Sequence, residues 1–153
     1  MGIELTEVLE EAKASARKLQ ELMKKCGYDR FYDELENVCY DTKDPDAAQT
    51  FTELNTFFEL ISCATASMEY IDKPIKYAGQ LWKNKNDRFE LDGLELSCGS
   101  ILEILIEKEA DELENNYMEW VRTRIEYDQE QKRYYAVGHH EEILEGIAAR
   151  IRG

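Results

Sequence analysis

The sequence predicts an α+β fold, in which an N-terminal three-helix bundle packs on a small C-terminal antiparallel β-barrel of the SH3-like kind. Apolar residues first recur every three or four positions, as on a helix face. After Pro74 they alternate with polar residues, as in strands. Only Asp72, Lys73 and Pro74 connect the two patterns, and no Gly/Ser-rich linker separates them. We therefore expect residues 1–74 and 75–153 to form a helical bundle and a barrel packed into one rigid unit.

The first two helices are predicted from apolar spacing. Residues 4–26 carry one apolar stripe, and Gly27 fits the left-handed position that ends many helices. A second helix is expected over 29–40, where Phe31, Leu35 and other apolar residues fall on one face. It would lie beside the first helix in the bundle.

The third helix is predicted over residues 45–71 and has a defined start. Asp44 fits an N-cap, and Pro45 fits the first helical position, where a missing N–H costs nothing. Pro74 ends the helical region. Three amphipathic helices with short connections predict an antiparallel bundle.

The second half predicts five or six short strands. Asp92-Gly93, between residues 88–91 and 94–97, is typical of a two-residue type I′ hairpin turn. Residues 101–107 fit a buried strand or a short helix equally well. The other expected strands cover 80–83, 117–127, 133–137 and 147–152. A barrel is predicted because so many short strands cannot leave many edges unpaired.

The amino-acid composition and net charge of the chain argue against several classes of function. The chain has 153 residues, with 33 Asp and Glu against 19 Lys and Arg, for a formal net charge of −14. This charge repels nucleic acid and anionic membranes, and 43% hydrophobic residues suffice for a core. No apolar run approaches a membrane span, and the start does not resemble a secretory signal. The four cysteines lack metal-site spacing, so we expect free, buried thiols in a cytoplasmic protein.

Acidic residues cluster in two stretches. Such runs are commonly solvated faces that keep a protein soluble. On a rigid scaffold they can also mimic the phosphates of a nucleic acid and occupy a partner's Lys/Arg channel. The first cluster consists of Asp29, Asp33, Glu34, Glu36, Asp41, Asp44 and Asp46, against Arg30 and Lys43. The second consists of Glu107, Glu109, Asp111, Glu112 and Glu114, preceded by Glu103, against Lys108 alone.

Basic residues of the predicted barrel support an alternative. If Val121, Thr123 and Ile125 face inward, the arginines between them face outward and could bind a nucleic acid. The same arginines could instead pair with acids on neighbouring strands. The candidate nucleic-acid face consists of Lys83, Lys85, Arg88, Arg122, Arg124, Arg150 and Arg152, and the candidate acids are Glu90, Glu95, Glu119 and Glu126.

Enzyme chemistry has little support in the sequence. No Gly-rich phosphate loop, G-x-S-x-G or H-E-x-x-H motif is present. Cys98 with His139 or His140 could form a nucleophile and base, but a Cys before Gly is more often a packing residue. We therefore expect a protein that is not an enzyme and uses no cofactor or metal.

Three segments and the C-terminal end resemble an uncharacterised domain family that is encoded largely on mobile genetic elements of Gram-positive bacteria. They are Tyr28–Leu35, Tyr70–Ile75, Gly79–Gly99 and Leu144-Glu145-Gly146 with the strand after it, and the resemblance spans residues 20–153. It implies a setting on a plasmid, phage or conjugative element, but no activity. Small acidic proteins of such elements often block host nucleases, so by analogy with anti-CRISPR proteins we expect inhibition of a basic nucleic-acid-binding protein, for example a CRISPR effector nuclease.

Overall fold

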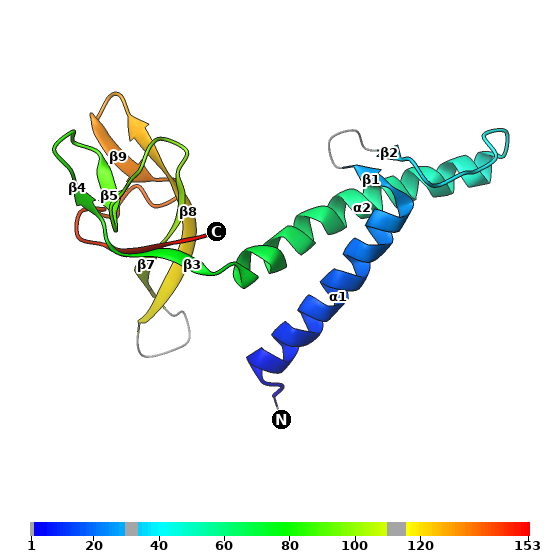
Figure 1. Cartoon of the computed structure of the whole chain (residues 1–153), viewed down its shortest axis with the longest axis horizontal. Helices are drawn as coiled ribbons and strands as arrows, with labels where there is room; N and C mark the ends of the chain where they lie inside the picture. The colour runs from blue at the N-terminus through cyan, green and yellow to red at the C-terminus, as the bar shows by residue number, and fades with distance from the viewer. Residues whose placement is uncertain (1, 30–33, 110–115) are drawn as a thin grey trace. The chain divides into compact units, whose positions relative to one another are not determined.

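The computed structural model describes residues 2–29, 34–109 and 116–153 (Figure 1). The chain divides into two compact units, Met1–Asp72 and Lys73–Gly153. The first, the helical unit, contains two helices and a two-stranded pairing, and the second, the β unit, contains the remaining strands. Each unit is described by itself below.

The two helices of the helical unit begin and end where capping chemistry places them. Helix α1 spans Leu5–Cys26 and ends at Gly27, which is left-handed at φ 68° and donates its N–H to the carbonyls of the last turn. Helix α2 spans Pro45–Asp72. A carboxylate oxygen of Asp44 accepts the N–H of Asp46 at 3.0 Å, which is the N-cap contact that the sequence predicted.

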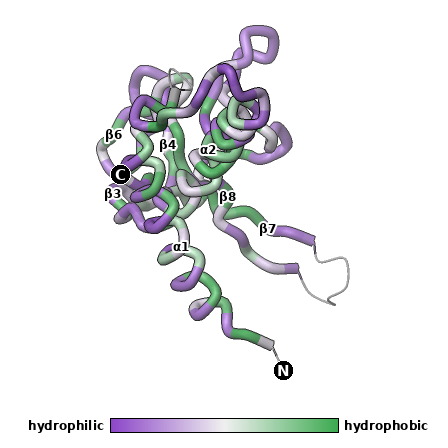
Figure 2. Tube along the Cα trace, turned by 90° about the vertical axis from the view of Figure 1, so that its right-hand side faces the viewer, coloured by the Kyte–Doolittle hydropathy of each residue, from purple (hydrophilic) through white to green (hydrophobic). Residues whose placement is uncertain are grey.

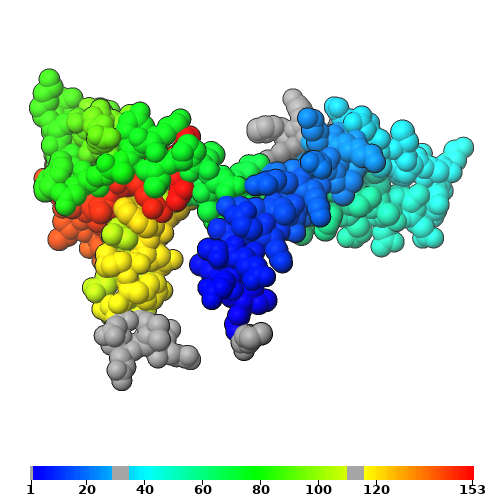
Figure 3. Space-filling model, turned by 60° about the horizontal axis from the view of Figure 1, so that its bottom comes forward, coloured from blue at the N-terminus to red at the C-terminus, as the bar shows by residue number. Residues whose placement is uncertain are grey.

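Helices α1 and α2 run antiparallel. Lys13, in the first half of α1, pairs with Asp72 at the end of α2, whereas Tyr28, just after the end of α1, packs on Phe58 in the middle of α2. Figure 3 shows the side chains of α1, in blue, against those of α2. Ala16 of α1 and Thr65 and Phe58 of α2 are buried in this unit. Its core is therefore thin.

The predicted three-helix bundle is wrong, because residues 29–40 do not form a helix. Tyr28–Asp29 (β1) pairs antiparallel with Glu34–Leu35 (β2), and residues 30–33 lie outside the described residues. The N–H of Asn37 donates to the Cys26 carbonyl at 3.1 Å, which folds the chain back beside the end of α1. A short helix is costly to nucleate, whereas this return buries Leu35 and stacks Tyr40 on Phe51 of α2.

Ten strands are described in the chain, and eight of them build two antiparallel sheets in the β unit. The larger sheet has the order β3-β10-β7-β8-β9 and the smaller has the order β4-β5-β6. The strands of the larger sheet are β3 (Ile75–Gln80), β10 (Ala148–Arg152), β7 (Ile101–Lys108), β8 (Tyr117–Asp128) and β9 (Arg133–Ala136). Those of the smaller are β4 (Trp82–Lys83), β5 (Phe89–Leu91) and β6 (Leu94–Glu95).

The predicted SH3-like barrel is also wrong, because the larger sheet stays open between its edge strands β3 and β9. Its apolar face is covered instead by the smaller sheet and its flanking residues. One buried cluster joins Leu81, Phe89 and Leu91 of the smaller layer to Leu102 and Ile104 of the larger. Covering one face with a second layer buries the core without closing the sheet.

Some of the strand predictions are confirmed, but the strand expected over 80–83 is wrong in its bounds: Gln80 ends β3, Leu81 lies in no strand, and only Trp82–Lys83 form β4. The part of β3 over residues 75–79 was not predicted. Leu91 pairs with Leu94 around Asp92 (φ 49°) and Gly93 (φ 81°), the two positive angles that a type I′ turn requires. Residues 101–107, which fitted a strand or a helix, form strand β7.

The cysteine prediction is confirmed only in part. All four thiols are free, but Cys39, Cys63 and Cys98 are exposed rather than buried.

Candidate functional site

The acids of the first cluster surround the chain between α1 and α2. Asp29 and Glu34 lie in β1 and β2, and Asp33 lies outside the described residues. Asp41 accepts the N–H of Lys43 at 2.9 Å, so this acid and the N-cap Asp44 shape the turn that precedes α2.

Four acids of this cluster have described side chains: Glu36, Asp41, Asp44 and Asp46. All four are exposed. Within the part of the chain that the structure describes, none of them forms an ion pair with a Lys or Arg. Their charge therefore reaches solvent uncompensated.

The second cluster is only partly described. Glu107 lies near the end of β7 and Glu109 follows that strand, and both are exposed. Asp111, Glu112 and Glu114 lie outside the described residues. Neither Glu107 nor Glu109 pairs with a base among the described residues.

Glu103 differs from the acids that follow it. It is 6% exposed and accepts hydrogen bonds from Arg150 and, at 3.0 Å, from Nε of Arg152. Arg150 also lies over the ring of Trp120, 4.2 Å from its centroid. This buried carboxylate between two arginines is a structural ion cluster of the β unit. In the sequence, Glu103 is a lone acidic residue inside an apolar run, a pattern that points to a buried, paired carboxylate.

The acids outside the clusters are paired in several places. Lys13 binds Asp72 at 2.7 Å and Glu10 at 3.2 Å. Lys83 binds Asp87 at 2.8 Å, and Arg88 binds Glu95 at 3.1 Å. Hydrogen bonds from Asn84 and Asn86, together with Arg88, lower the pKa of Glu95. Other described acids outside the clusters, among them Glu7, Glu21, Glu53 and Glu59, are exposed and form none of these ion pairs, so lack of pairing is not confined to the clusters.

The arginines of β8 and β10 do share the outer face of the larger sheet, as predicted. Thr123 and Ile125 are buried on the core side, and Arg122 and Arg124 are exposed on the other. Arg150 is paired in register with Glu103, as is Arg122, so these residues share that face.

Most of these arginines are already bound to acids. Arg124 pairs with Glu126 at 3.0 Å, and Arg150 and Arg152 hold Glu103. Of the predicted cross-strand pairs, Arg88 with Glu95 is present, whereas Arg124 pairs with Glu126 of its own strand and Glu103 was not among the predicted acids. Lys85 is exposed in the turn before β5.

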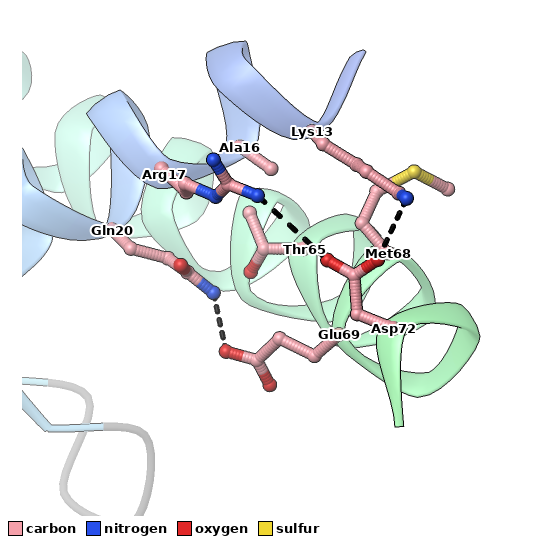
Figure 4. A pocket seen from close by; sticks show the side chains of 8 residues that line it. All are labelled: Lys13, Ala16, Arg17, Gln20, Thr65, Met68, Glu69 and Asp72. Carbon is pink, nitrogen blue, oxygen red and sulfur yellow. Dashed lines mark hydrogen bonds and ion pairs between the residues drawn. The ribbon is translucent and has the colours of Figure 1, made fainter. Parts of the chain in front are cut away.

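The groove on one side of the α1–α2 contact, drawn in Figure 4, has a volume of about 200 Å³. Asp72 accepts from Lys13 and lies 4.0 Å from Arg17, and Gln20 donates to Glu69. The hydrogen bond to Asp72 is the main cause that raises the pKa of Lys13. Because the charges point at one another across the groove, they join the two helices.

Two of the residues considered for catalysis, Cys98 and His140, lie in turns of the β unit. Cys98 is exposed, and the His140 ring stacks on Tyr135 at 4.2 Å. Among the described residues, no group of three His, Cys, Asp or Glu side chains is placed to hold a metal ion. No described helix combines the length and apolar character that a bilayer crossing requires.

The fold and surface define a two-unit α+β protein with an antiparallel two-sheet domain and exposed acidic clusters. Residues 79–151, from β3 to β10, match the profile of a family described as a domain of unknown function (DUF5348), so the β unit contains this domain. The match starts at Gly79 and leaves out Tyr28–Leu35 and Tyr70–Ile75, so the resemblance expected over 20–153 is shown only for the β unit. No curated protein and no solved structure matches the chain.

Proposed function

We propose that this protein is a non-catalytic inhibitor that binds a basic nucleic-acid-binding protein through its acidic clusters. One observation carries the proposal. The described acids Glu36, Asp41, Asp46, Glu107 and Glu109 are exposed and unpaired with bases, and within each cluster they lie close together in the sequence.

The physical advantage of such a surface is electrostatic. Carboxylates that lack a partner within the chain are available to Arg and Lys side chains of another molecule. A net charge of −14 on 153 residues also attracts a basic partner over a distance and speeds association at low salt. Asp41 and Asp44 accept backbone N–H groups, which fixes the direction of those carboxylates.

The partner class follows from this charge. A groove that binds nucleic acid is lined by Lys and Arg and accepts a series of negative groups. The sequence resemblance implies a setting on a mobile element, and under that hypothesis a host defence nuclease, in particular a CRISPR effector, is the first partner to test.

Direct nucleic-acid binding by the arginine face is the weaker alternative. Arg150 and Arg152 have side chains only 18% and 16% exposed, and both are committed to Glu103. A phosphate would have to compete with that carboxylate, and the protein as a whole repels polyanions.

The test removes charge from the first cluster without removing its hydrogen-bond acceptors. A variant carrying Glu36→Gln, Asp41→Asn, Asp44→Asn and Asp46→Asn keeps the amide oxygens that can cap the turn. Its association rate with a guide-loaded CRISPR effector nuclease, measured by surface plasmon resonance at low salt, should fall by about tenfold or more.

The matched control neutralises four exposed acids elsewhere in the helical unit: Glu7, Glu21, Glu53 and Glu59, each changed to Gln. Both variants lose the same charge, so an equal effect would show that only net charge matters. Absence of any binding by the unchanged protein would exclude this nuclease class. A labelled oligonucleotide that shifts with the unchanged protein would instead favour the arginine face.

A further inference from the structure

Helix α1 carries an open apolar seam beside its contact with α2. The seam repeats with a spacing of three and four residues, and Figure 2 shows hydrophobic positions recurring along this helix. Leu5, Val8 and Leu22 are 80%, 47% and 42% exposed. The full seam consists of Leu5, Val8, Ala12, Ser15, Leu19, Leu22 and Cys26.

The seam lies on the opposite side of the helix pair from the charged groove of Figure 4. Ala12, Ser15 and Leu19 line a second groove of about 270 Å³ with Ile61 and Met68 of α2. Apolar side chains along the edge and floor of an open groove are typical of a surface that packs against another helix.

A row of charges borders this seam, on the side away from α2, at intervals of seven residues. It reads Glu4, Glu11, Lys18 and Lys25, with the acids first and the bases last. All four side chains are exposed, and none forms an ion pair with another described residue. In an isolated helix this order only complements the helix dipole.

The same row is complementary to itself when a second α1 runs antiparallel. Glu11 then lies opposite Lys18 of the second copy, and Glu4 lies opposite its Lys25, and symmetry repeats both pairs. The apolar seam fits this antiparallel pairing, with core layers that are offset by two residues from the flanking charge pairs. Leu5 meets Leu22 of the other copy, and Leu19 meets Val8, with the small Ala12 and Ser15 at the centre.

We propose that α1 is the interface of a homodimer, in which two copies of this chain pack their α1 seams antiparallel. Two independent features of the sequence, the apolar spacing and the charge order, select the same antiparallel pairing. A second copy of α1 provides both a matching apolar seam and charges in the opposite order, whereas a generic apolar partner would explain only the apolar spacing. The described residues of the helical unit also bury few apolar side chains, which leaves apolar surface that a second copy would cover.

The first experiment measures the mass of the full chain by multi-angle light scattering. The expected mass is twice the 17.9 kDa of one chain. Val8→Lys should return the chain to a monomer, because it places a charge in the seam. The control Ala14→Lys adds the same charge to an exposed position of α1 outside the seam and should stay dimeric. A monomer at all accessible concentrations of the unchanged chain overturns the proposal.

The second experiment tests the antiparallel register by charge exchange. Glu11→Lys alone and Lys18→Glu alone each turn two attractive pairs into repulsive ones and should weaken the dimer by about tenfold. The double variant restores both pairs and should recover the affinity, as sedimentation equilibrium would show. A double variant as weak as the single ones overturns the register, and circular dichroism confirms that each variant folds.

Discussion

The two units differ in how much they bury. The β unit has a continuous cluster that includes Leu81, Leu91 and Ile104, all fully buried. In the described part of the helical unit, the buried residues are Ala16, Leu35, Phe58 and Thr65. A sheet covered by a second layer closes its own core, whereas two crossed helices leave an apolar side open. We therefore expect the two units to differ in stability and to unfold independently of each other.

Both units can be followed separately in one unfolding experiment. The two tryptophans, Trp82 and Trp120, belong to the β unit, while most of the helical signal comes from α1 and α2. Tryptophan fluorescence therefore reports the β unit, and circular dichroism at the helical band reports the helical unit.

Phe58→Ala should break the helical unit alone. Phe58 is 2% exposed and packs on Tyr28, and removing a buried Phe costs about 3–5 kcal/mol. The helical transition should move to much lower denaturant, while the fluorescence transition stays in place. Phe57→Ala is the matched control, because Phe57 is 46% exposed and its loss should cost about 1 kcal/mol or less. Transitions that move together would show that the units unfold as one.

Glu103→Ala should break the β unit instead. It leaves Arg150 and Arg152 partly buried without their carboxylate, and breaking a buried ion cluster costs about 3–5 kcal/mol. The fluorescence transition should move accordingly. Glu126→Gln removes the more exposed pair with Arg124 and should cost about 1 kcal/mol or less. Similar losses in the two variants would contradict the structural role of Glu103.

Local features of the fold were predictable from the sequence. The turn at Asp92-Gly93 and the caps at Asp44 and Gly27 depend on residues close to one another in the chain. Residues 29–40 were misread because their apolar spacing fits a helix, while the return beside α1 depends on distant contacts with Phe51 and Phe58. Propensity in so short a segment is easily outweighed by tertiary packing.

The sheet order and the Glu103 ion cluster were not predicted, because both depend on pairing between strands that are far apart in the chain. Strand β10 lies between β3 and β7, so the order of the sheet depends on a contact between the two ends of the β unit. The same contact brings Arg150 to Glu103 across 47 positions of the chain. The acidic clusters could be found by counting residues, but only the structure separates paired acids from unpaired ones.

Asp44→Ala gives a smaller, local effect on the helical unit. It removes the acceptor of the Asp46 N–H at the start of α2, and loss of an N-cap costs about 1 kcal/mol. The midpoint of the helical transition should fall slightly. Asp44→Asn keeps a side-chain oxygen acceptor and should recover most of the loss. Equal losses for Ala and Asn would mean that the charge, and not the cap, stabilises this end.

Glu95→Gln should give the smallest effect, and only in the fluorescence transition. The pKa of Glu95 is lowered from its ordinary value of 4.5, first by hydrogen bonds from Asn84 and Asn86. A carboxyl group with a lowered folded-state pKa stabilises the fold above its unfolded pKa and loses that contribution as the pH falls through the folded value. The unchanged protein should therefore be slightly more stable than the variant at neutral pH.

The pH series decides whether that difference has the assigned cause. As the pH falls from 4.5 through the lower pKa of Glu95 in the folded protein, the midpoints of the unchanged protein and Glu95→Gln should converge, because the carboxyl becomes protonated and both side chains are then neutral. Glu107→Gln removes an exposed carboxylate that has no ion pair to a described base, and it is the control for the loss of one negative charge. A constant gap between the unchanged protein and Glu95→Gln at every pH would show that shape, and not charge, explains the contribution of Glu95. The hairpin would then owe its stability to the Asp92-Gly93 turn and the buried Phe89 and Leu91.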